Sequence, residues 1–272
     1  MSLLQSLLLG ALQGITEFLP VSSSGHLVLV KALLHIQTGN DISFEVFVHF
    51  GTLLSVVIVF KNDIAALIKV SVHALMHPRS WSKMYRTSEP FRLALFILVG
   101  CIPAGVIGVA FNERIEQLFA DPKLVADMLI VTGVILYLTR FAKPSAEAPV
   151  TLRSSIATGL AQAVAIIPGI SRSGATISMA LLMGVSQEYA AKFSFLMAVP
   201  VIFGATVLKA RHFVDARPTG DQVQAIIAGT IVAFVTGYFS LKLLLGLLRS
   251  GKFSRFSYYC LTLGILGILF VE

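Results

Sequence analysis

A polar face near the N-terminus carries the first residues that could perform chemistry. Gln13 and Glu17 are four residues apart, so on a helix both project from one face. Glu17 stands in apolar sequence, where a carboxylate is costly and most often marks a functional site. Its oxygens and the amide oxygen of Gln13 suit Mg²⁺ or Ca²⁺, which often bind jointly with substrate phosphates. We predict a divalent-cation site here; the simpler alternative is an acid that serves helix packing.

Hydroxyl groups and an imidazole follow this face directly. The segment contains a proline, three consecutive serines and a histidine: Pro20, Ser22, Ser23, Ser24 and His26. One serine is expected to cap a helix that starts near Gly25, which leaves other hydroxyls as a nucleophile or as phosphate donors. His26 can act as a general acid or base near neutral pH. We predict catalytic roles for Glu17, Ser23 and His26, and substrate binding by Ser22 and Ser24.

A second polar segment, far along the chain, has the chemistry of an anion site. Its members are Ser171, Arg172, Ser173, Gly174 and Thr176. Backbone N–H groups at a helix start attract anions, and the Arg172 guanidinium can hold a phosphate through two parallel hydrogen bonds. We predict that Arg172 is catalytic and that the other four residues bind substrate. The alternative is a capped turn whose arginine pairs with a neighbouring acid.

Glu45 and His49 form another pair spaced four residues apart, within a later apolar stretch. We predict that they line the same cavity behind the first set of residues; a plain hydrogen bond between helices is the alternative. Phosphate donors, a carboxylate, a hydroxyl and an imidazole together fit hydrolysis of a phosphate ester or anhydride. That reaction depends mainly on positioning and on charge stabilisation.

The elements that position these residues must lie in a membrane. The 272 residues are 56% hydrophobic and 13% charged, with mean hydropathy +0.85, whereas soluble domains carry about 25% charged residues. Six apolar stretches can span a bilayer: Ile42–Phe60, Phe91–Phe111, Met128–Phe141, Phe193–Leu208, Val223–Leu248 and Phe256–Val271. The fold class is therefore all-α and polytopic, and the substrate is expected to be a lipid phosphate. The net charge of +7 is assigned to cytoplasmic loops, because no nucleic-acid-binding motif is present.

Two further apolar regions are interrupted by the polar segments. Their halves are Ser2–Leu19 with Leu27–Ile36, and Ile156–Ile167 with Ile177–Val185. Each half is short for a span, so we predict two re-entrant helical hairpins whose broken backbone lines a polar cavity. An offset of 149 residues (from 22 to 171) also relates Gln13 to Gln162 and Phe44 to Phe193. We predict a single domain, residues 1–272, containing two repeats near 1–110 and 150–248.

Loop charge predicts the orientation of these repeats. The basic segments are Lys61–Arg92, Arg140–Arg153 and Arg249–Arg255, and they alternate with Asn112–Asp127 and Lys209–Asp221. The positive-inside rule places the first three in the cytoplasm. The hairpins then enter from opposite sides, the repeats are inverted, and the two breaks meet near the midplane. The site is expected to open to the extracytoplasmic side.

Both polar segments resemble the signatures of one known family. Residues 13–26, QGITEFLPVSSSGH, resemble the [EQ]xxxE…PVSS[ST]GH motif of bacterial undecaprenyl-pyrophosphate phosphatases of the bacitracin-resistance type. Pro168–Thr176, PGISRSGAT, resembles the PGxSRSxxT motif of that family. The resemblance extends along most of the chain, including FSFLMAVP at Phe193–Pro200.

The resemblance implies an enzyme of the bacterial plasma (inner) membrane that removes the terminal phosphate of undecaprenyl pyrophosphate. This activity recycles the lipid carrier of cell-wall synthesis and confers bacitracin resistance, and it requires a divalent cation. The expected partners are this lipid and membrane lipids, without nucleic acid; a homodimer is a candidate assembly. Many members have Glu in place of Gln13, so metal binding here depends more on Glu17. The nucleophile stays open between Ser23, His26 and a metal-bound water.

A prenyl-phosphate flippase or transporter is the rival prediction, because inverted repeats with broken helices are typical of transporters. Detergent-solubilised protein incubated with a prenyl pyrophosphate should release inorganic phosphate if the chain is a hydrolase. A pure carrier would release none.

Overall fold

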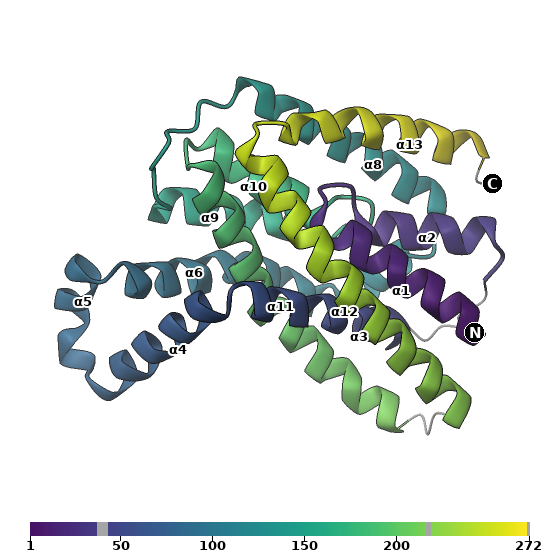
Figure 1. The fold of residues 1–272 in the computed structure, drawn as a ribbon, viewed down its shortest axis with the longest axis horizontal. Coiled ribbons are helices and arrows are strands. Elements are labelled where there is room, and N and C mark those ends of the chain that lie inside the picture. The colour runs from purple at the N-terminus through teal and green to yellow at the C-terminus, as the bar shows by residue number, and fades with distance from the viewer. Residues whose placement is uncertain (37–42, 216–218, 271–272) are drawn as a thin grey trace.

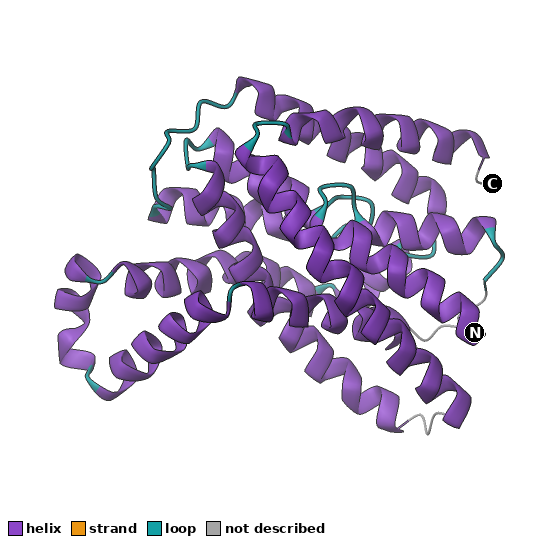
Figure 2. Ribbon diagram, in the orientation of Figure 1, coloured by secondary structure: helices purple, strands orange, loops and turns teal. Residues whose placement is uncertain are grey.

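The computed structural model describes residues 1–36, 43–215 and 219–270, and its regular elements there are all helical (Figures 1 and 2). The α-helices are α1 Leu3–Phe18, α2 Ser23–Leu33, α3 Ser43–Val59, α4 Lys61–Met76, α5 Trp81–Thr87, α6 Glu89–Ala110, α7 Asn112–Leu118, α8 Pro122–Leu138, α9 Leu152–Val164, α10 Arg172–Leu182, α11 Gln187–Asp215, α12 Gly220–Arg249 and α13 Phe256–Phe270. Short 3₁₀ turns follow α4, α8 and α12.

The described helices confirm an all-α polytopic membrane protein. Five of them, α6, α8, α11, α12 and α13, are long and apolar enough to cross a membrane. The sixth predicted span is α3, a shorter apolar helix. One boundary differs from the prediction: α11 continues to Asp215, so the connection expected from Lys209 is mostly helical.

Both predicted interruptions are present. The first lies between Phe18, where α1 ends, and Ser23, where α2 begins; the second separates α9 from α10. The N-cap Ser22 has the left-handed φ of 65°, which is uncommon for a residue with a side chain, and its Oγ accepts a hydrogen bond from Gly25 N at 3.2 Å. The capped helix therefore begins two residues before the predicted Gly25.

Helix α1 packs against α12 through small residues. A Cβ placed on Gly10 would lie 2.4 Å from the backbone oxygen of Gly229, so the two helix backbones are in direct contact. One turn earlier, the Ser6 hydroxyl donates a hydrogen bond to the Ala225 carbonyl. This seam joins the first hairpin to a spanning helix from the other half of the chain.

Helix α9 makes the matching contacts with α6. A Cβ on Gly159 would lie 2.5 Å from the Gly100 oxygen, and Ser155 Oγ donates to the Phe96 carbonyl at 2.6 Å. On the hairpin helices, α1 and α9, the contacting residues are related by an offset of 149 residues (6 to 155, and 10 to 159). On the spanning helices, α6 and α12, they are related by an offset of 129 residues (96 to 225, and 100 to 229). The second hairpin thus repeats the packing of the first.

A third pair of contacts shows the same correspondence. Helices α8 and α13 lie side by side (Figure 1), where a Cβ on Gly133 would meet Leu261 and a Cβ on Gly264 would meet Ile130. Both pairs are related by an offset of 131 residues (130 to 261, and 133 to 264). Residues 3–138, from α1 to α8, and residues 152–270, from α9 to α13, are below called the N-terminal and C-terminal halves.

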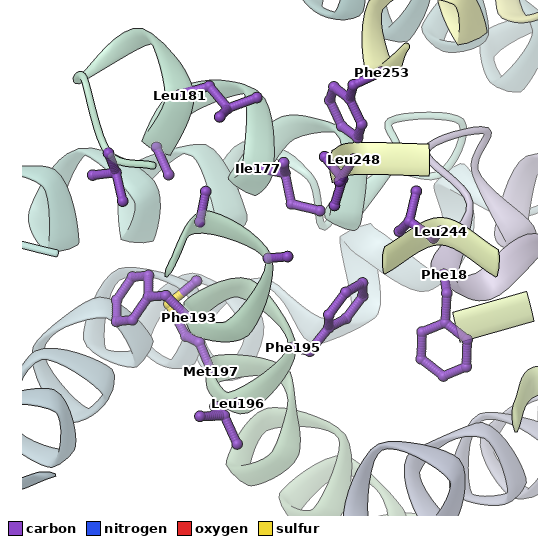
Figure 3. Packing of buried hydrophobic residues seen from close by; sticks show 14 of the residues in the cluster. Phe18, Ile177, Leu181, Phe193, Phe195, Leu196, Met197, Leu244, Leu248 and Phe253 are labelled. Atoms are coloured by element: carbon purple, nitrogen blue, oxygen red, sulfur yellow. The ribbon is translucent and has the colours of Figure 1, made fainter. Parts of the chain in front are cut away.

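The largest apolar core includes Phe18 and Val21, at the break of the first hairpin (Figure 3). Phe18 is 1% exposed and packs edge-on against Phe195 of α11, with ring centroids 5.5 Å apart. Leu244 and Leu248 of α12 belong to the same cluster. Because Phe18 directly follows Glu17, this core fixes the helix end that carries the predicted catalytic carboxylate.

Helices α4 and α5 form an arm on the left of Figure 1, where they pack against α6 through Ala74, Met84 and Phe91. The Trp81 indole N–H of α5 donates to the Ala74 carbonyl of α4 at 2.7 Å, which closes the arm on itself. This arm occupies the basic segment Lys61–Arg92, and its helices have no counterpart in the sequence-based prediction.

Gly10→Ala should lower the thermal unfolding temperature of the detergent-solubilised protein. The added methyl group overlaps the Gly229 carbonyl, and overpacking of this kind costs about 1–3 kcal/mol. Gly105→Ala in α6 is the matched control, because a Cβ there has no atom within 4 Å. Equal melting temperatures for the two variants would contradict the close α1–α12 seam.

Candidate active site

The carboxylate of Glu17 is the centre of a buried polar cluster. Glu17 is 7% exposed and lies in the last turn of α1. Its Oε2 accepts hydrogen bonds from Gln13 Nε2 at 2.8 Å and from Ser23 Oγ at 2.6 Å. The predicted cation-binding pair and one serine of the first break are therefore in direct contact.

Arg172 brings the second break to this carboxylate. It is the first residue of α10, and its Nη2 donates to Glu17 Oε1 in an ion pair. The break segments also meet where Ser173 Oγ donates to the Leu19 carbonyl at 3.3 Å. Among the described residues, Arg172 Nη1 is buried without a hydrogen-bond partner. Arg172 thus pairs with an acid, the alternative raised from sequence, and keeps one donor group for a further acceptor.

Glu45 and His49 lie beside the cluster on α3, but only the histidine faces it. His49 Nε2 is 3.4 Å from Glu17 Oε2, and the opposite ring nitrogen, Nδ1, is 2.7 Å from the Glu45 carbonyl. The Glu45 side chain instead forms an ion pair with Lys31 of α2. Lys31 was not identified from sequence, because a lysine near a helix end is also typical of a membrane interface.

Both ring nitrogens of His26 are engaged away from Glu17. Nδ1 is 2.8 Å from the Ser22 carbonyl, and Nε2 is 2.7 Å from the Tyr259 hydroxyl of α13. Since a carbonyl only accepts, Nδ1 carries the hydrogen, and in the neutral ring Nε2 accepts from the tyrosine. The two rings are also stacked, 3° from parallel. Tyr259 has no sequence signal that separates it from tyrosines at membrane interfaces.

The predicted substrate-binding serines mainly support the breaks themselves. Ser22 caps α2 and lies 3.2 Å from Ser24 Oγ, while Ser171 caps α10 through Gly174 N at 3.0 Å. Ser171 Oγ lies 3.3 Å from the Ser173 hydroxyl. The two breaks thus have the same local construction, a capping serine that contacts the hydroxyl two residues later.

Thr176 is held inside its own helix. Its Oγ1 donates to the Arg172 carbonyl at 2.7 Å and lies 2.6 Å from Ser194 Oγ of α11. These contacts fix the first turn of α10. Thr176 is therefore placed to orient the backbone of Arg172 in this structure.

Helix α8 supports the second break through a threonine that sequence reasoning missed. Thr132 Oγ1 donates to the Gly169 carbonyl at 2.9 Å and accepts from Ser171 N at 3.0 Å. Gly169 has a φ of 93°, and a Cβ there would lie 2.4 Å from the Val125 oxygen of α8. Only glycine fits this close approach of the break to α8.

Two side chains of the cluster, Glu17 and Gln13, have oxygen atoms of the kind that divalent cations bind. Within the described residues, no three His, Cys, Asp or Glu side chains gather as metal ligands. The amide oxygen of Gln13, Oε1, is nevertheless buried without a hydrogen-bond partner. The amide nitrogen of the same side chain, Nε2, donates to Glu17. An oxygen-rich pair that is completed by phosphate oxygens is a common arrangement for Mg²⁺.

Comparison with known proteins assigns the chain to a family. The model of the family described as bacitracin resistance protein BacA matches residues 6–266. The chain belongs to this BacA family. Relatives named undecaprenyl-diphosphatase include proteins of Salinibacter ruber, 43% identical over 97% of both chains, and of Halothermothrix orenii, 42% identical over 99% of this chain and 98% of the relative. One from Korarchaeum cryptofilum is 39% identical, over 97% of this chain and 98% of the relative.

Arg172→Gln should lower the unfolding temperature strongly, because it leaves the buried Glu17 carboxylate without its cation. Breaking a buried ion pair costs about 3–5 kcal/mol. Adding Glu17→Gln to this variant should restore part of the loss, since the unpaired charge is then removed. The measurement is thermal unfolding in detergent for both single variants and the double variant.

Lys192→Gln is the control. Its ion pair with Asp63, at 2.6 Å, has side chains that are 29% and 34% exposed, so its loss should change stability little. Additive effects of the Glu17 and Arg172 substitutions would show that the pair is not energetically coupled.

Proposed function

We propose that this protein hydrolyses undecaprenyl pyrophosphate to undecaprenyl phosphate and inorganic phosphate. The reaction recycles the lipid carrier of cell-wall synthesis and confers resistance to bacitracin. The carrying observation is that one buried carboxylate, Glu17, contacts both the Ser23 hydroxyl and the Arg172 guanidinium, in a chain of the BacA family. The proposed base, the proposed nucleophile and the proposed phosphate-binding guanidinium are therefore in contact.

Ser23 is the proposed nucleophile. Its Oγ attacks the terminal phosphorus while its proton passes to Glu17 Oε2, which is 2.6 Å away. The bond from that phosphorus to the bridging oxygen breaks, and undecaprenyl phosphate leaves with the proton that Glu17 returns to it. Water then attacks the phosphoserine, again giving its proton to Glu17. The bond from Ser23 Oγ to phosphorus breaks, inorganic phosphate leaves, and Glu17 returns the proton to Ser23 Oγ.

Arg172 is proposed to stabilise the charge on the transferred phosphate. Its unpartnered Nη1 is available to a phosphate oxygen, while Nη2 stays close to Glu17. Charge-assisted hydrogen bonds of this kind strengthen as negative charge develops in the transition state. The backbone N–H groups at the start of α10 add to the same potential.

His26 is proposed to position the nucleophile. The sequence favours a proton-transfer role, whereas the contacts support a structural one: Nδ1–H holds the Ser22 carbonyl, and Tyr259 holds Nε2. Ser22 has a left-handed backbone, so this hydrogen bond stabilises the turn that presents Ser23 to Glu17.

Glu17 and the free amide oxygen of Gln13 are proposed to hold a divalent cation, with Mg²⁺ or Ca²⁺ expected from their oxygen donors. When bound, the cation supplies positive charge that stabilises the phosphate oxygens. Gln13 also donates to Glu17 Oε2, which fixes the carboxylate in the orientation that Ser23 requires.

We also propose that the two repeats predicted near 1–110 and 150–248 are inverted, and that the site opens to the extracytoplasmic side of the plasma membrane. The matching seams, Gly10 with Gly229 and Gly159 with Gly100, support the repeat. The basic arm Lys61–Arg92 supports the orientation. A homodimer stays a prediction.

Ser23→Ala should reduce phosphate release from undecaprenyl pyrophosphate by at least about 10²-fold, because both the nucleophile and the proton donor to Glu17 are lost. The measurement is initial-rate phosphate release in detergent at saturating lipid. Thr87→Ala is the control: it removes a hydroxyl of α5 that donates to the Lys83 carbonyl rather than to Glu17, and it should stay close to wild type. Full activity in Ser23→Ala would exclude Ser23 as the nucleophile.

A further inference from the structure

We propose that His49 is a direct ligand of the divalent cation, so that this site has a nitrogen donor and binds Mn²⁺ more tightly than Mg²⁺ or Ca²⁺. The proposal deepens the proposed function, since it specifies the metal chemistry of the same site. It rests on the orientation of the His49 ring and on the groups that face its free nitrogen.

The hydrogen bond at Nδ1 determines which ring nitrogen of His49 can bind a cation. Nδ1 lies 2.7 Å from the Glu45 carbonyl oxygen, which can only accept, so Nδ1 carries a hydrogen. In the neutral ring, Nε2 therefore has a free lone pair. Metal-binding histidines characteristically donate their second N–H to a carbonyl or carboxylate in this way.

The free nitrogen faces another electron-pair donor. His49 Nε2 is 3.4 Å from Glu17 Oε2, which is longer than a normal N–H···O hydrogen bond. At this separation the nitrogen and the oxygen are close enough to bind one shared ion.

A third donor completes the set on the protein side. The Gln13 amide oxygen is buried and has no hydrogen-bond partner among the described residues. Gln13 and Glu17 lie on one face of α1, and His49 comes from α3, which packs against α1. The protein thus offers an imidazole nitrogen and a carboxylate oxygen that face each other, and a buried amide oxygen on the residue that bonds to this carboxylate.

A hydrogen bond and a neighbouring ion pair hold the His49 side chain in position. The Glu45 carboxylate forms an ion pair with Lys31 of α2, which ties the first turn of α3 to the first hairpin. The same turn supplies the carbonyl that holds the His49 ring. The ring itself is 29% exposed, so a ligand can reach it.

The donor set determines the metal preference. Ca²⁺ and Mg²⁺ bind oxygen ligands almost exclusively, whereas imidazole nitrogen suits first-row transition metals. Mn²⁺ accepts both kinds of donor and keeps the octahedral geometry that phosphate oxygens can complete. One imidazole beside two oxygens therefore shifts the preference towards Mn²⁺.

The test is pulsed electron paramagnetic resonance of Mn²⁺ bound to the detergent-solubilised protein with methylenediphosphonate, a non-hydrolysable pyrophosphate mimic. We expect electron spin echo envelope modulation from a directly bound ¹⁴N. In protein labelled with ¹⁵N-histidine the modulation should change to that of ¹⁵N, an observation that needs no substitution. In His49→Gln the modulation should disappear. Absence of a nitrogen signal in the wild type, or its persistence in His49→Gln, would overturn the proposal.

Calorimetry supplies an independent readout with the same mimic. Loss of groups outside the ligand shell already weakens metal sites by about 10–100-fold, so His49→Gln should weaken Mn²⁺ binding at least about 10-fold. The affinity for Ca²⁺ should change less. His73→Gln, a histidine of the α4 arm that stacks on His77, is the control and should bind both ions like the wild type. Equal losses for Mn²⁺ and Ca²⁺ would contradict a nitrogen ligand.

Phosphate release measured in parallel separates this proposal from the proposed function. A wild-type protein that hydrolyses the lipid with Mn²⁺ but shows no bound nitrogen disproves only the role of His49. A protein that releases no phosphate with any of the three ions, yet shows the nitrogen signal, disproves only the proposed hydrolysis.

Discussion

The buried ion pair between Glu17 and Arg172 is the interaction on which the rest of the structure depends. Each residue lies at the broken end of a helical hairpin, and each charge would be costly to bury alone. Each break therefore needs the charged residue of the other to neutralise its own buried charge. The carboxylate also orders the groups around it, because Gln13 and Ser23 donate to one oxygen while Arg172 occupies the other.

A site of this kind interrupts two helices, and the surrounding helices compensate for the lost helical hydrogen bonds. Capping serines, Ser22 and Ser171, satisfy the first N–H groups of α2 and α10. Thr132 of α8 bonds both to a carbonyl and to an N–H of the second break. Some polar residues of the breaks therefore form the cluster around Glu17, and others stabilise the backbone. Most hydroxyls of the motifs belong to the second group.

Much of this arrangement could be predicted from sequence, because its signals are local. Hydropathy located the spans, and proline with glycine and hydroxyl residues located the breaks between α1 and α2 and between α9 and α10. The spacing of Gln13 and Glu17 placed them on one face of α1. The family motifs then connected both breaks to one reaction.

The remaining features could not be predicted, because they depend on contacts between distant segments. Tyr259 and Thr132 reach the site from α13 and α8, and nothing near them in sequence distinguishes them from ordinary membrane residues. The different orientations of Glu45 and His49 follow from Lys31, which lies on another helix. The helices of the basic arm, α4 and α5, were also missed, since their charged residues obscure the apolar pattern.

The exchange of helices between the two halves has a mechanical consequence. Helix α12 of the C-terminal half contacts α1 of the N-terminal half, and α6 of the N-terminal half contacts α9 of the C-terminal half, both at backbone distance. Rotation of one half against the other would have to separate both contacts at once. The two seams therefore oppose such a rotation together, and the proposed path of the lipid head group leads to a centre that both seams hold in place.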